Sequence, residues 1–454
     1  MKLQHAKFHF VGVGGIGMCG LAELLHNIGA KVSGSDIADN ANTDRLKDLG
    51  VKIYKGHAAT NIGDADVVVY SSAIQYGNPE ISEARARQIP LIPRAEALAE
   101  IMRLKRGIAV AGTHGKTTTT SMTSAIFLEA GLKPTIVVGG RFELIKSTAM
   151  LGTGEWLVAE ADESDGSFNK LSPEIAIITN IDADHLDHYK TFENLQKAFH
   201  DFALKVPFYG KIIACGDDLV VRQIFEHFPK RIELYGFDER SDLILSGEQG
   251  KYSLYRNDRL LGSKTLIGDF KLNVPGRHNA LNAVAAISAG MAAGISFADC
   301  AKGLQRYEGV DRRFHFKGEK SGIRVYDDYG HHPTEVRAVL QAFREKYPDK
   351  RLVVFFQPHR YSRTEHCWHD FTTAFKEADQ VLLTDIYPAG EAPIPGVTSE
   401  KLAQEMKHEH TQYFVRDEKA TQKILGMLKK DDVFITLGAG DGWKLGMDVL
   451  KNIN

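Results

Sequence analysis

The stretch IAVAGTHGKTT, residues 108–118, decides the fold. Its first four residues predict a buried strand, a short loop with two glycines follows, and residues 119–131 predict a helix. The loop departs from the pattern G-x-x-x-x-G-K-[ST], because the first glycine of that spacing would fall at Val110. The ending of the pattern is kept and predicts an ATP site. Gly115 allows close approach of the backbone, Lys116 meets the β and γ phosphates, and Thr117 meets magnesium.

Acidic residues and histidines follow the next two predicted strands. Glu160 comes directly after EWLVA, residues 155–159, and His185 comes shortly after EIAIITNI, residues 174–181. The carboxyl ends of parallel strands meet at one edge of a sheet, and magnesium prefers oxygen ligands. We therefore expect Glu160 to bind the metal, with His185 beside it. Glu163, Asp187 and His188 fit an ordinary acidic surface turn equally well.

A second glycine loop lies near the start of the chain. GVGGIG, residues 12–17, follows a strand-like run and precedes a helix-like run, and Asp36 stands about 20 residues further on. Read alone, this pattern predicts NAD binding. The physical requirement is broader, since amide groups at a helix N-terminus hold any nucleoside diphosphate. A tight turn that merely needs glycine is the other interpretation.

Three α/β domains explain the order of the predicted elements. Apolar strand-like runs alternate with amphipathic runs throughout, which indicates parallel sheets. We expect a Rossmann-like domain at residues 1–104, a central domain with a parallel sheet of the P-loop ATPase type at 105–311, and a Rossmann-like α/β domain at 312–454. In the last of these, Pro333 suits the first turn of a helix. The apolar face of that helix consists of Val336, Val339, Leu340 and Phe343.

The composition excludes several classes of protein. Lysine and arginine total 56 against 58 aspartates and glutamates, so we expect no binding of nucleic acid or of an anionic membrane. The four cysteines, at positions 19, 215, 300 and 367, form no C-x-x-C pair, which is typical of packing residues in a reducing compartment. There is no signal-peptide pattern and no apolar stretch of membrane-spanning length. These features predict a cytoplasmic protein.

Seven blocks of sequence, spread over the predicted central and C-terminal domains, are similar to the Mur ligases. The blocks are AGTHGKTTTTSM, AEADESDGSF, TNIDADHLDHY, GRHNALNA, GVDRRF, DDYGHHPTEV and QPHRYSRT. This resemblance implies an N-terminal domain that holds a UDP-sugar, a central domain that carries ATP and magnesium, and a C-terminal domain that closes over both. One departure stands at His200, where several members of the family carry a carbamylated lysine, so the ligands of a second metal stay open.

The resemblance also implies a set of site residues. The UDP-sugar would contact Gly14, Gly15, Ile16, Gly17, Ser35, Asp36, Ser71, Ala73 and Ile74. ATP would contact Gly112, Thr113, His114, Gly115, Lys116, Thr117, Thr118, His278, Asn279, Asn282, Arg313 and Asp328, and the metal would be held by Thr117, Glu160 and His185. The amino acid would contact Tyr329, His331, His359, Arg360 and Arg363. The catalytic residues would be Lys116, Glu160, His185, Arg360 and Arg363. Helix capping by the asparagines, and surface charge for the arginines, are the alternatives.

Within the family, the sequence is most similar to the branch that adds L-alanine to UDP-N-acetylmuramate. This resemblance implies ATP as co-substrate, Mg²⁺ or Mn²⁺ as cofactor, an acyl-phosphate intermediate, a role in peptidoglycan precursor synthesis, and a monomer or weak homodimer. The branch that adds a tripeptide to the same UDP-sugar is the first alternative, although DDYGHHPTEV favours the alanine branch. An NAD-dependent oxidoreductase is an alternative from a different class, but it would not explain the phosphate loop GTHGKTT. A regulatory P-loop NTPase would need no UDP-sugar.

Overall fold

Three β-sheets form the framework of the described chain. The computed structural model describes residues 3–71, 74, 77–258 and 261–453. Two of the sheets belong to a first compact unit, which comprises residues 1–246, 252–271 and 281–308. The third sheet belongs to a second unit, which comprises residues 247–251, 272–280 and 309–454.

The N-terminal sheet has five parallel strands in the order β3-β2-β1-β4-β5. The strands are β1 (Lys7–Val11), β2 (Lys31–Asp36), β3 (Lys52–Lys55), β4 (Val67–Tyr70) and β5 (Leu91–Pro93). Alternate residues of β1 point to opposite faces. Phe8 and Phe10 pack in the same core cluster as helix α1 (Ile16–Ile28), whereas Val11 packs with helix α3 (Pro79–Ala86). This sheet with helices on both faces confirms the Rossmann-like prediction.

The central sheet has ten strands in the order β15-β14-β13-β12-β11-β10-β6-β9-β7-β8. The strands are β6 (Arg106–Ala111), β7 (Thr135–Phe142), β8 (Ser147–Met150), β9 (Trp156–Glu160), β10 (Ile175–Ile178), β11 (Lys211–Cys215), β12 (Ile232–Gly236), β13 (Leu243–Glu248), β14 (Lys251–Asp258) and β15 (Ser263–Lys271). The prediction of a parallel sheet is correct for the run from β13 to β7. It is wrong at the β8 edge, where β7 and β8 pair antiparallel, because so short a connection can join only antiparallel neighbours.

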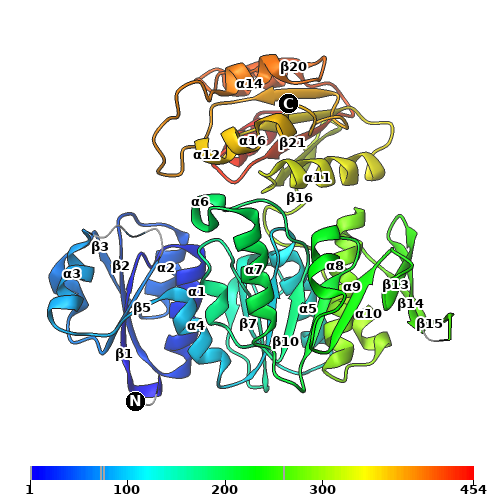
Figure 1. Cartoon of the computed structure of the whole chain (residues 1–454). Helices are drawn as coiled ribbons and strands as arrows, with labels where there is room; N and C mark the ends of the chain where they lie inside the picture. The colour runs from blue at the N-terminus through cyan, green and yellow to red at the C-terminus, as the bar shows by residue number, and fades with distance from the viewer. Residues whose placement is uncertain (1–2, 72–73, 75–76, 259–260, 454) are drawn as a thin grey trace. The chain divides into compact units, whose positions relative to one another are not determined.

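The N-terminal and central sheets share one hydrophobic core cluster. Helix α1 contacts both β7 and β8, and Figure 1 shows the two sheets, in blue and in cyan to green, with α1 between them. The other helices up to residue 305 are α2 (Ala41–Asp48), α4 (Arg94–Met102), α5 (Lys116–Glu129), α6 (Leu186–Tyr189), α7 (Phe192–Ala203), α8 (Leu219–Phe225), α9 (Arg277–Ala292) and α10 (Phe297–Gln305), with short 3₁₀ helices η1 (Leu3–His5), η2 (Ala59–Ile62) and η3 (Ser167–Lys170). Both glycine loops therefore lie in a single unit.

The third sheet has the order β16-β17-β21-β18-β19-β20 and is parallel except for the edge pair of β16 and β17. Its strands are β16 (His315–Lys320), β17 (Ile323–Asp328), β18 (Leu352–Phe356), β19 (Gln380–Leu383), β20 (Thr411–Tyr413) and β21 (Val433–Leu437). Val354 packs with the helices on one face, and Val353 packs with those on the other face. The helices are α11 (Pro333–Lys346), α12 (Tyr361–His366), α13 (Trp368–Phe371), α14 (Ser399–Glu405), α15 (Ala420–Met427) and α16 (Trp443–Asn452).

The helix predicted to begin at Pro333 is confirmed, since α11 starts there and buries its four apolar residues. All four cysteine side chains are buried. Within the described ranges, none of the helices combines the length and the apolar character that crossing a membrane requires.

Candidate active site

The phosphate loop, residues 112–118, joins β6 to α5 and depends on two glycines. Gly112 has a φ of +139° and Gly115 a φ of +82°, values that residues other than glycine rarely adopt. A Cβ atom on Gly112 would collide with the Thr179 hydroxyl, and one on Gly115 would lie 2.7 Å from Asn282 Oδ1. Backbone conformation and steric crowding therefore both require glycine at these positions.

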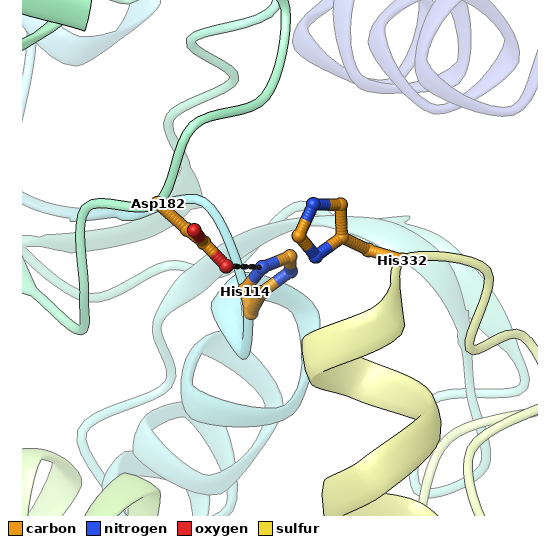
Figure 2. Close-up of side chains that lie close together, drawn as sticks. All are labelled: His114, Asp182 and His332. Carbon is orange, nitrogen blue, oxygen red and sulfur yellow. Dashed lines mark hydrogen bonds and ion pairs between the residues drawn. The ribbon is translucent and has the colours of Figure 1, made fainter. Parts of the chain in front are cut away.

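The residues that follow β10 hold this loop in shape. The His114 amide donates to Asn180 Oδ1 at 2.8 Å, and the Thr113 amide donates to the Asn180 carbonyl at 3.1 Å. His114 Nε2 lies 3.1 Å from Asp182 Oδ2, and Figure 2 shows these two side chains facing each other. The loop that the sequence predicts for phosphates is thus built jointly by two adjacent strand ends.

Lys116 is the cation of the phosphate loop, and its side chain is only 13% exposed. Its Nζ donates to the Gly112 carbonyl at 2.7 Å and to the Thr113 carbonyl at 3.0 Å. The same Nζ lies 2.9 and 2.8 Å from the two carboxylate oxygens of Glu163, which is fully buried. The lysine is therefore charged, aimed across its own loop, and paired with a carboxylate from the β9 side of the sheet.

Burial sets the protonation of this pair. Burial opposes the charge of Lys116, but the carboxylates of Glu163, Asp162 and Glu160 outweigh it and raise the pKa of Lys116 above its usual value. Burial raises the pKa of Glu163 to about 7, against the opposing pull of Lys116. Glu163 is thus a buried carboxyl group with a raised pKa, and such groups are typical of functional sites.

Two of the three predicted metal ligands lie next to each other. Thr117 Oγ1 donates to Glu160 Oε1 at 3.1 Å, and the Gly139 amide donates to the other carboxylate oxygen of Glu160 at 2.7 Å. A hydroxyl and a carboxylate are donors that suit Mg²⁺. The third predicted ligand, His185, has its Nε2 3.7 Å from Glu163 and 3.7 Å from Asp184, on a backbone with φ +57°. The donor set at this strand edge fits a hard divalent cation.

The first glycine loop is fastened to the end of β2. The amides of Gly12 and Val13 donate to the Ser35 carbonyl at 2.9 and 3.0 Å, and the Gly14 amide donates to Asp36 Oδ2 at 2.8 Å. Asp36 therefore supports the loop itself. The Ser35 hydroxyl is buried and points into a polar cluster that also contains Glu80.

The end of β4 lies against the same loop. A Cβ atom on Gly12 would be 3.1 Å from Ile74 Cδ1 and 3.5 Å from Ser71 Cβ. The structure thus brings Ser71 and Ile74 to the glycine loop, as a common UDP-sugar site requires. Ala73 and the side chain of Ile16 lie outside the described residues.

Asp328, at the end of β17, lies in the second unit. Its carboxylate accepts the Phe314 amide at 2.6 Å and the Gly330 amide at 2.7 Å. Burial raises the pKa of Asp328 to about 6, although the nearby Arg313 opposes this shift. The guanidinium of Arg313 lies 5.2 Å from the centre of the Tyr329 ring and 3.6 Å from a carboxylate oxygen of Glu335.

His278 and Asn279, which were also predicted to bind ATP, belong to this second unit. Asn282 belongs to the first unit and lies against Gly115. Burial lowers the pKa of His278 to about 4, with a further contribution from Arg313. Asn279 Nδ2 donates to the Pro275 carbonyl at 2.7 Å. Asn279 lies within the first turn of α9 and its side-chain amide is a donor in this contact, whereas a helix N-cap accepts from backbone amides, so this hydrogen bond is not the cap that the alternative interpretation proposed.

Histidines and arginines gather at the ends of β17 and β18. The His331 and His359 rings are 5.6 Å apart, and the His359 ring is stacked on Tyr387. Arg363 Nη1 lies 3.3 Å from His359 Nδ1, and the Arg363 side chain is largely buried. Arg360 precedes α12 with a φ of +70°. The second unit thus carries a compact cationic and aromatic cluster.

His332 begins α11, the helix on which Figure 2 labels it. Its Nδ1 accepts the Thr334 amide at 3.4 Å, and Glu335 accepts the His332 amide at 3.2 Å, which together form a capping box. This cap fixes the start of α11, which is separated from the end of β17 by only four residues.

Sequence profiles of one protein family match each part of the chain that carries these features. The profile described as "Mur ligase family, catalytic domain" matches residues 7–106, the Mur ligase middle domain matches 110–290, and the profile "Mur ligase, glutamate ligase domain" matches 312–440. The chain belongs to the Mur ligase family.

Individual Mur ligases are similar to this chain over its whole length. The UDP-N-acetylmuramate–L-alanine ligase of Bdellovibrio bacteriovorus is 86% identical over 453 residues, which cover 100% of both chains. That of Trichlorobacter lovleyi is 49% identical over 98% of this chain and 99% of the relative. Among solved structures, the UDP-N-acetylmuramate–alanine ligase of Thermotoga maritima is 28% identical, with a TM-score of 0.81 over 98% of this chain and 99% of that one. These matches confirm the three-domain α/β fold.

Sequence reasoning missed one arginine of this Mur ligase. A Cβ atom on Gly17 would lie 2.9 Å from Arg94 Nη1, and Arg94 Nη2 donates to Asp162 Oδ2 at 3.3 Å. Arg94 therefore touches both the first glycine loop and the acidic segment beside the phosphate loop. Its position after IP, at the end of a short strand, is the only signal in the sequence, since the two partners are 77 and 68 residues away.

Proposed function

We propose that this Mur ligase joins L-alanine to the carboxylate of UDP-N-acetylmuramate while ATP is converted to ADP and phosphate, a step of peptidoglycan precursor synthesis. The observation that carries the choice of substrates is the full-length similarity to ligases named for these two compounds. The largely enclosed Lys116 in its glycine loop is the structural feature that agrees with ATP as the third substrate.

The reaction needs an activated acid. A free carboxylate does not form an amide at neutral pH, because oxide is a very poor leaving group. We propose that the sugar carboxylate attacks the γ-phosphate of ATP, giving an acyl phosphate and ADP. The amine of L-alanine then attacks the acyl carbon, and phosphate leaves with the bonding electrons of the C–O bond.

Lys116 is proposed to stabilise the transferring phosphoryl group. Two anions must approach each other in this step, so a preorganised cation lowers the barrier. The lysine is already fixed by two loop carbonyls and needs only to exchange Glu163 for a phosphate oxygen. Thr117, Glu160 and His185 would hold Mg²⁺, which supplies further positive charge to the phosphates.

The cluster at the ends of β17 and β18 is proposed to bind L-alanine. An amino-acid carboxylate pairs well with a positioned guanidinium, and Arg360 and Arg363 are the candidates. The lowered pKa of the buried His331, about 3, keeps its ring neutral at physiological pH. A neutral ring can accept a hydrogen bond from the incoming ammonium group.

The first glycine loop is proposed to hold the diphosphate of the UDP-sugar. Its amides open α1, and the N-terminus of a helix attracts anions. Residues 1–104, 105–311 and 312–454 are proposed as the UDP-sugar, ATP and amino-acid domains, in a chain that is a monomer or weak homodimer.

A substrate dropout assay tests the proposed function. ADP release should require UDP-N-acetylmuramate, L-alanine, ATP and Mg²⁺ together, and should fall to background when any one is omitted. A parallel reaction in which the tripeptide replaces L-alanine distinguishes the tripeptide-adding alternative. Faster turnover with the tripeptide would contradict the proposal, and so would reduction of NAD without ATP consumption.

A further inference from the structure

A buried polar cluster lies beside the first glycine loop, and the proposed chemistry gives its central carboxylate no role. Its centre is Glu80 on α3, whose side chain is fully buried. Glu80 accepts hydrogen bonds from the Ser35 hydroxyl at 2.5 Å and from Asn61 Nδ2 at 2.6 Å. His57 Nδ1 lies 3.2 Å and His9 Nε2 3.6 Å from the same carboxylate oxygen as Ser35. We call these five residues the Glu80 cluster.

Ser35 links this cluster to the glycine loop. Its hydroxyl donates to Glu80, while its carbonyl accepts the amides of Gly12 and Val13 at 2.9 and 3.0 Å. The carbonyl of the next residue, Asp36, accepts the amide of Gly56 at 2.7 Å, directly before His57. The end of β2 is therefore held by the Glu80 cluster on one side, and it holds the glycine loop on the other.

The chemistry of Glu80 makes it an effective anchor. Burial opposes its charge, but the nearby His9 ring and the hydrogen bonds from Ser35 and Asn61 prevail and lower the pKa of Glu80 to about 2. An ionised carboxylate only accepts hydrogen bonds, so each neighbour has a fixed donor direction. Replacing a buried charged network by apolar residues often costs no stability. We therefore expect the Glu80 cluster to fix the positions of its neighbours rather than to add to the stability of the fold.

We propose that Glu80 is a positioning residue for the UDP-sugar site. Through Ser35 it fixes residues 12–14, and so aims the amide groups that open α1 at the diphosphate of the UDP-sugar. The proposal rests on the proposed role of the first glycine loop. Glu80 is remote in sequence from the glycine loop, and it would act through Ser35 without contacting the substrate.

Glu80→Gln is the principal test, because glutamine keeps the size of the side chain and removes one acceptor oxygen and the charge. Losing a charge-assisted hydrogen bond should raise the KM for UDP-N-acetylmuramate about tenfold. The KM values for ATP and L-alanine, and kcat, should stay within about twofold, since the phosphate loop is fastened to other residues. Ser35→Ala should give the same selective increase, because it cuts the link but leaves Glu80 bonded to Asn61.

Glu23→Gln is the matched control. Glu23 is another buried carboxylate of the same unit, and it accepts hydrogen bonds from Arg45 at 2.8 and 3.0 Å and from Ser147 at 3.3 Å. This variant should lower the Tm without a selective change in the KM for the UDP-sugar. Were Glu80→Gln and Ser35→Ala to behave like Glu23→Gln, the cluster would be merely structural and the proposal overturned.

Gly14→Ala separates this proposal from the function it rests on. A Cβ atom there would lie 2.7 Å from Asn40 Nδ2 and 2.9 Å from Asp36 Oδ2, so the loop must shift. If Gly14→Ala raises the KM for the UDP-sugar while the Glu80 and Ser35 variants do not, only the positioning role fails. If Gly14→Ala also leaves that KM unchanged, the loop does not bind the UDP-sugar and both proposals fail. Should Glu80→Gln fold poorly, Ser35→Ala alone decides.

Discussion

Lys116 is held by two carbonyls and a carboxylate before any phosphate arrives, so its replacement tests the phosphate loop directly. Lys116→Ala should reduce ADP release by about a thousandfold or more, since a preorganised cation on the transferring phosphoryl group is lost. The measurement is steady-state ADP formation with all substrates present. Lys105→Ala is the control, because Lys105 Nζ also donates to two loop carbonyls, those of Gly152 and Gly154. It should lower the Tm and keep the activity; near-normal turnover of Lys116→Ala would contradict the assignment.

His331 should make stability depend on pH. Burial lowers its pKa from 6.5 to about 3, so between these values the folded protein binds fewer protons than the unfolded chain. The stability that this residue contributes is complete above pH 6.5 and is lost as the pH falls toward 3. Each unit of displacement corresponds to about 1.4 kcal/mol.

We therefore expect the Tm to fall less steeply between pH 7 and pH 4 for His331→Asn than for the wild type. Thermal unfolding across this pH range is the measurement. His369→Asn, at an exposed histidine of the same unit, should leave the slope unchanged. Parallel curves for His331→Asn and the wild type would refute the burial argument.

At the scale of elements, the strand-loop-helix unit of β6 and α5 depends on its first glycine. Gly112→Ala should cost about 1–2 kcal/mol for the positive φ and also displace the loop, because the new Cβ meets Thr179. Gly131→Ala is the matched control: its φ is +70°, but the new Cβ would meet nothing within 4 Å. Both variants should lose stability, and only Gly112→Ala should raise the KM for ATP. Equal KM values would show that the loop tolerates the displacement.

The strands that carry the site were predictable, because each is a short apolar run followed by polar residues. The runs at 155–159 and 174–181 correspond to β9 and β10. The strands β13 to β15 were not singled out, because β15 leaves most of its side chains exposed and so lacks an apolar pattern. The pairing of β7 with β8 was likewise missed, since the sequence between them carries no strong turn signal.

Pairings between side chains were the least predictable part of the site. Lys116 and Glu163 are both visible as functional candidates, but they are 47 residues apart, and only the order of β6 and β9 in the sheet brings them together. The burial of Ser35 follows from the position of α3, which strand periodicity does not reveal. Motifs therefore identified the chemistry, whereas the fold determined which residues act as pairs.

For the whole molecule, nucleotide binding should appear as added stability. A ligand that binds only the folded state stabilises it by about 2.7 kcal/mol at a hundred times its Kd. We expect a non-hydrolysable ATP analogue with Mg²⁺ to raise the Tm of the wild type in proportion to the logarithm of its concentration. Lys116→Ala should lose most of this shift while Lys105→Ala keeps it. Equal shifts for wild type and Lys116→Ala would place the nucleotide elsewhere.

Arg360 adopts a backbone conformation that suits glycine, with φ +70° and ψ 138°. Holding a long side chain there costs on the order of 1–3 kcal/mol. Selection for thermal stability alone would favour glycine at this position. Arg360 therefore trades stability for its proposed role, and Arg360→Gly is expected to raise the Tm while lowering the activity.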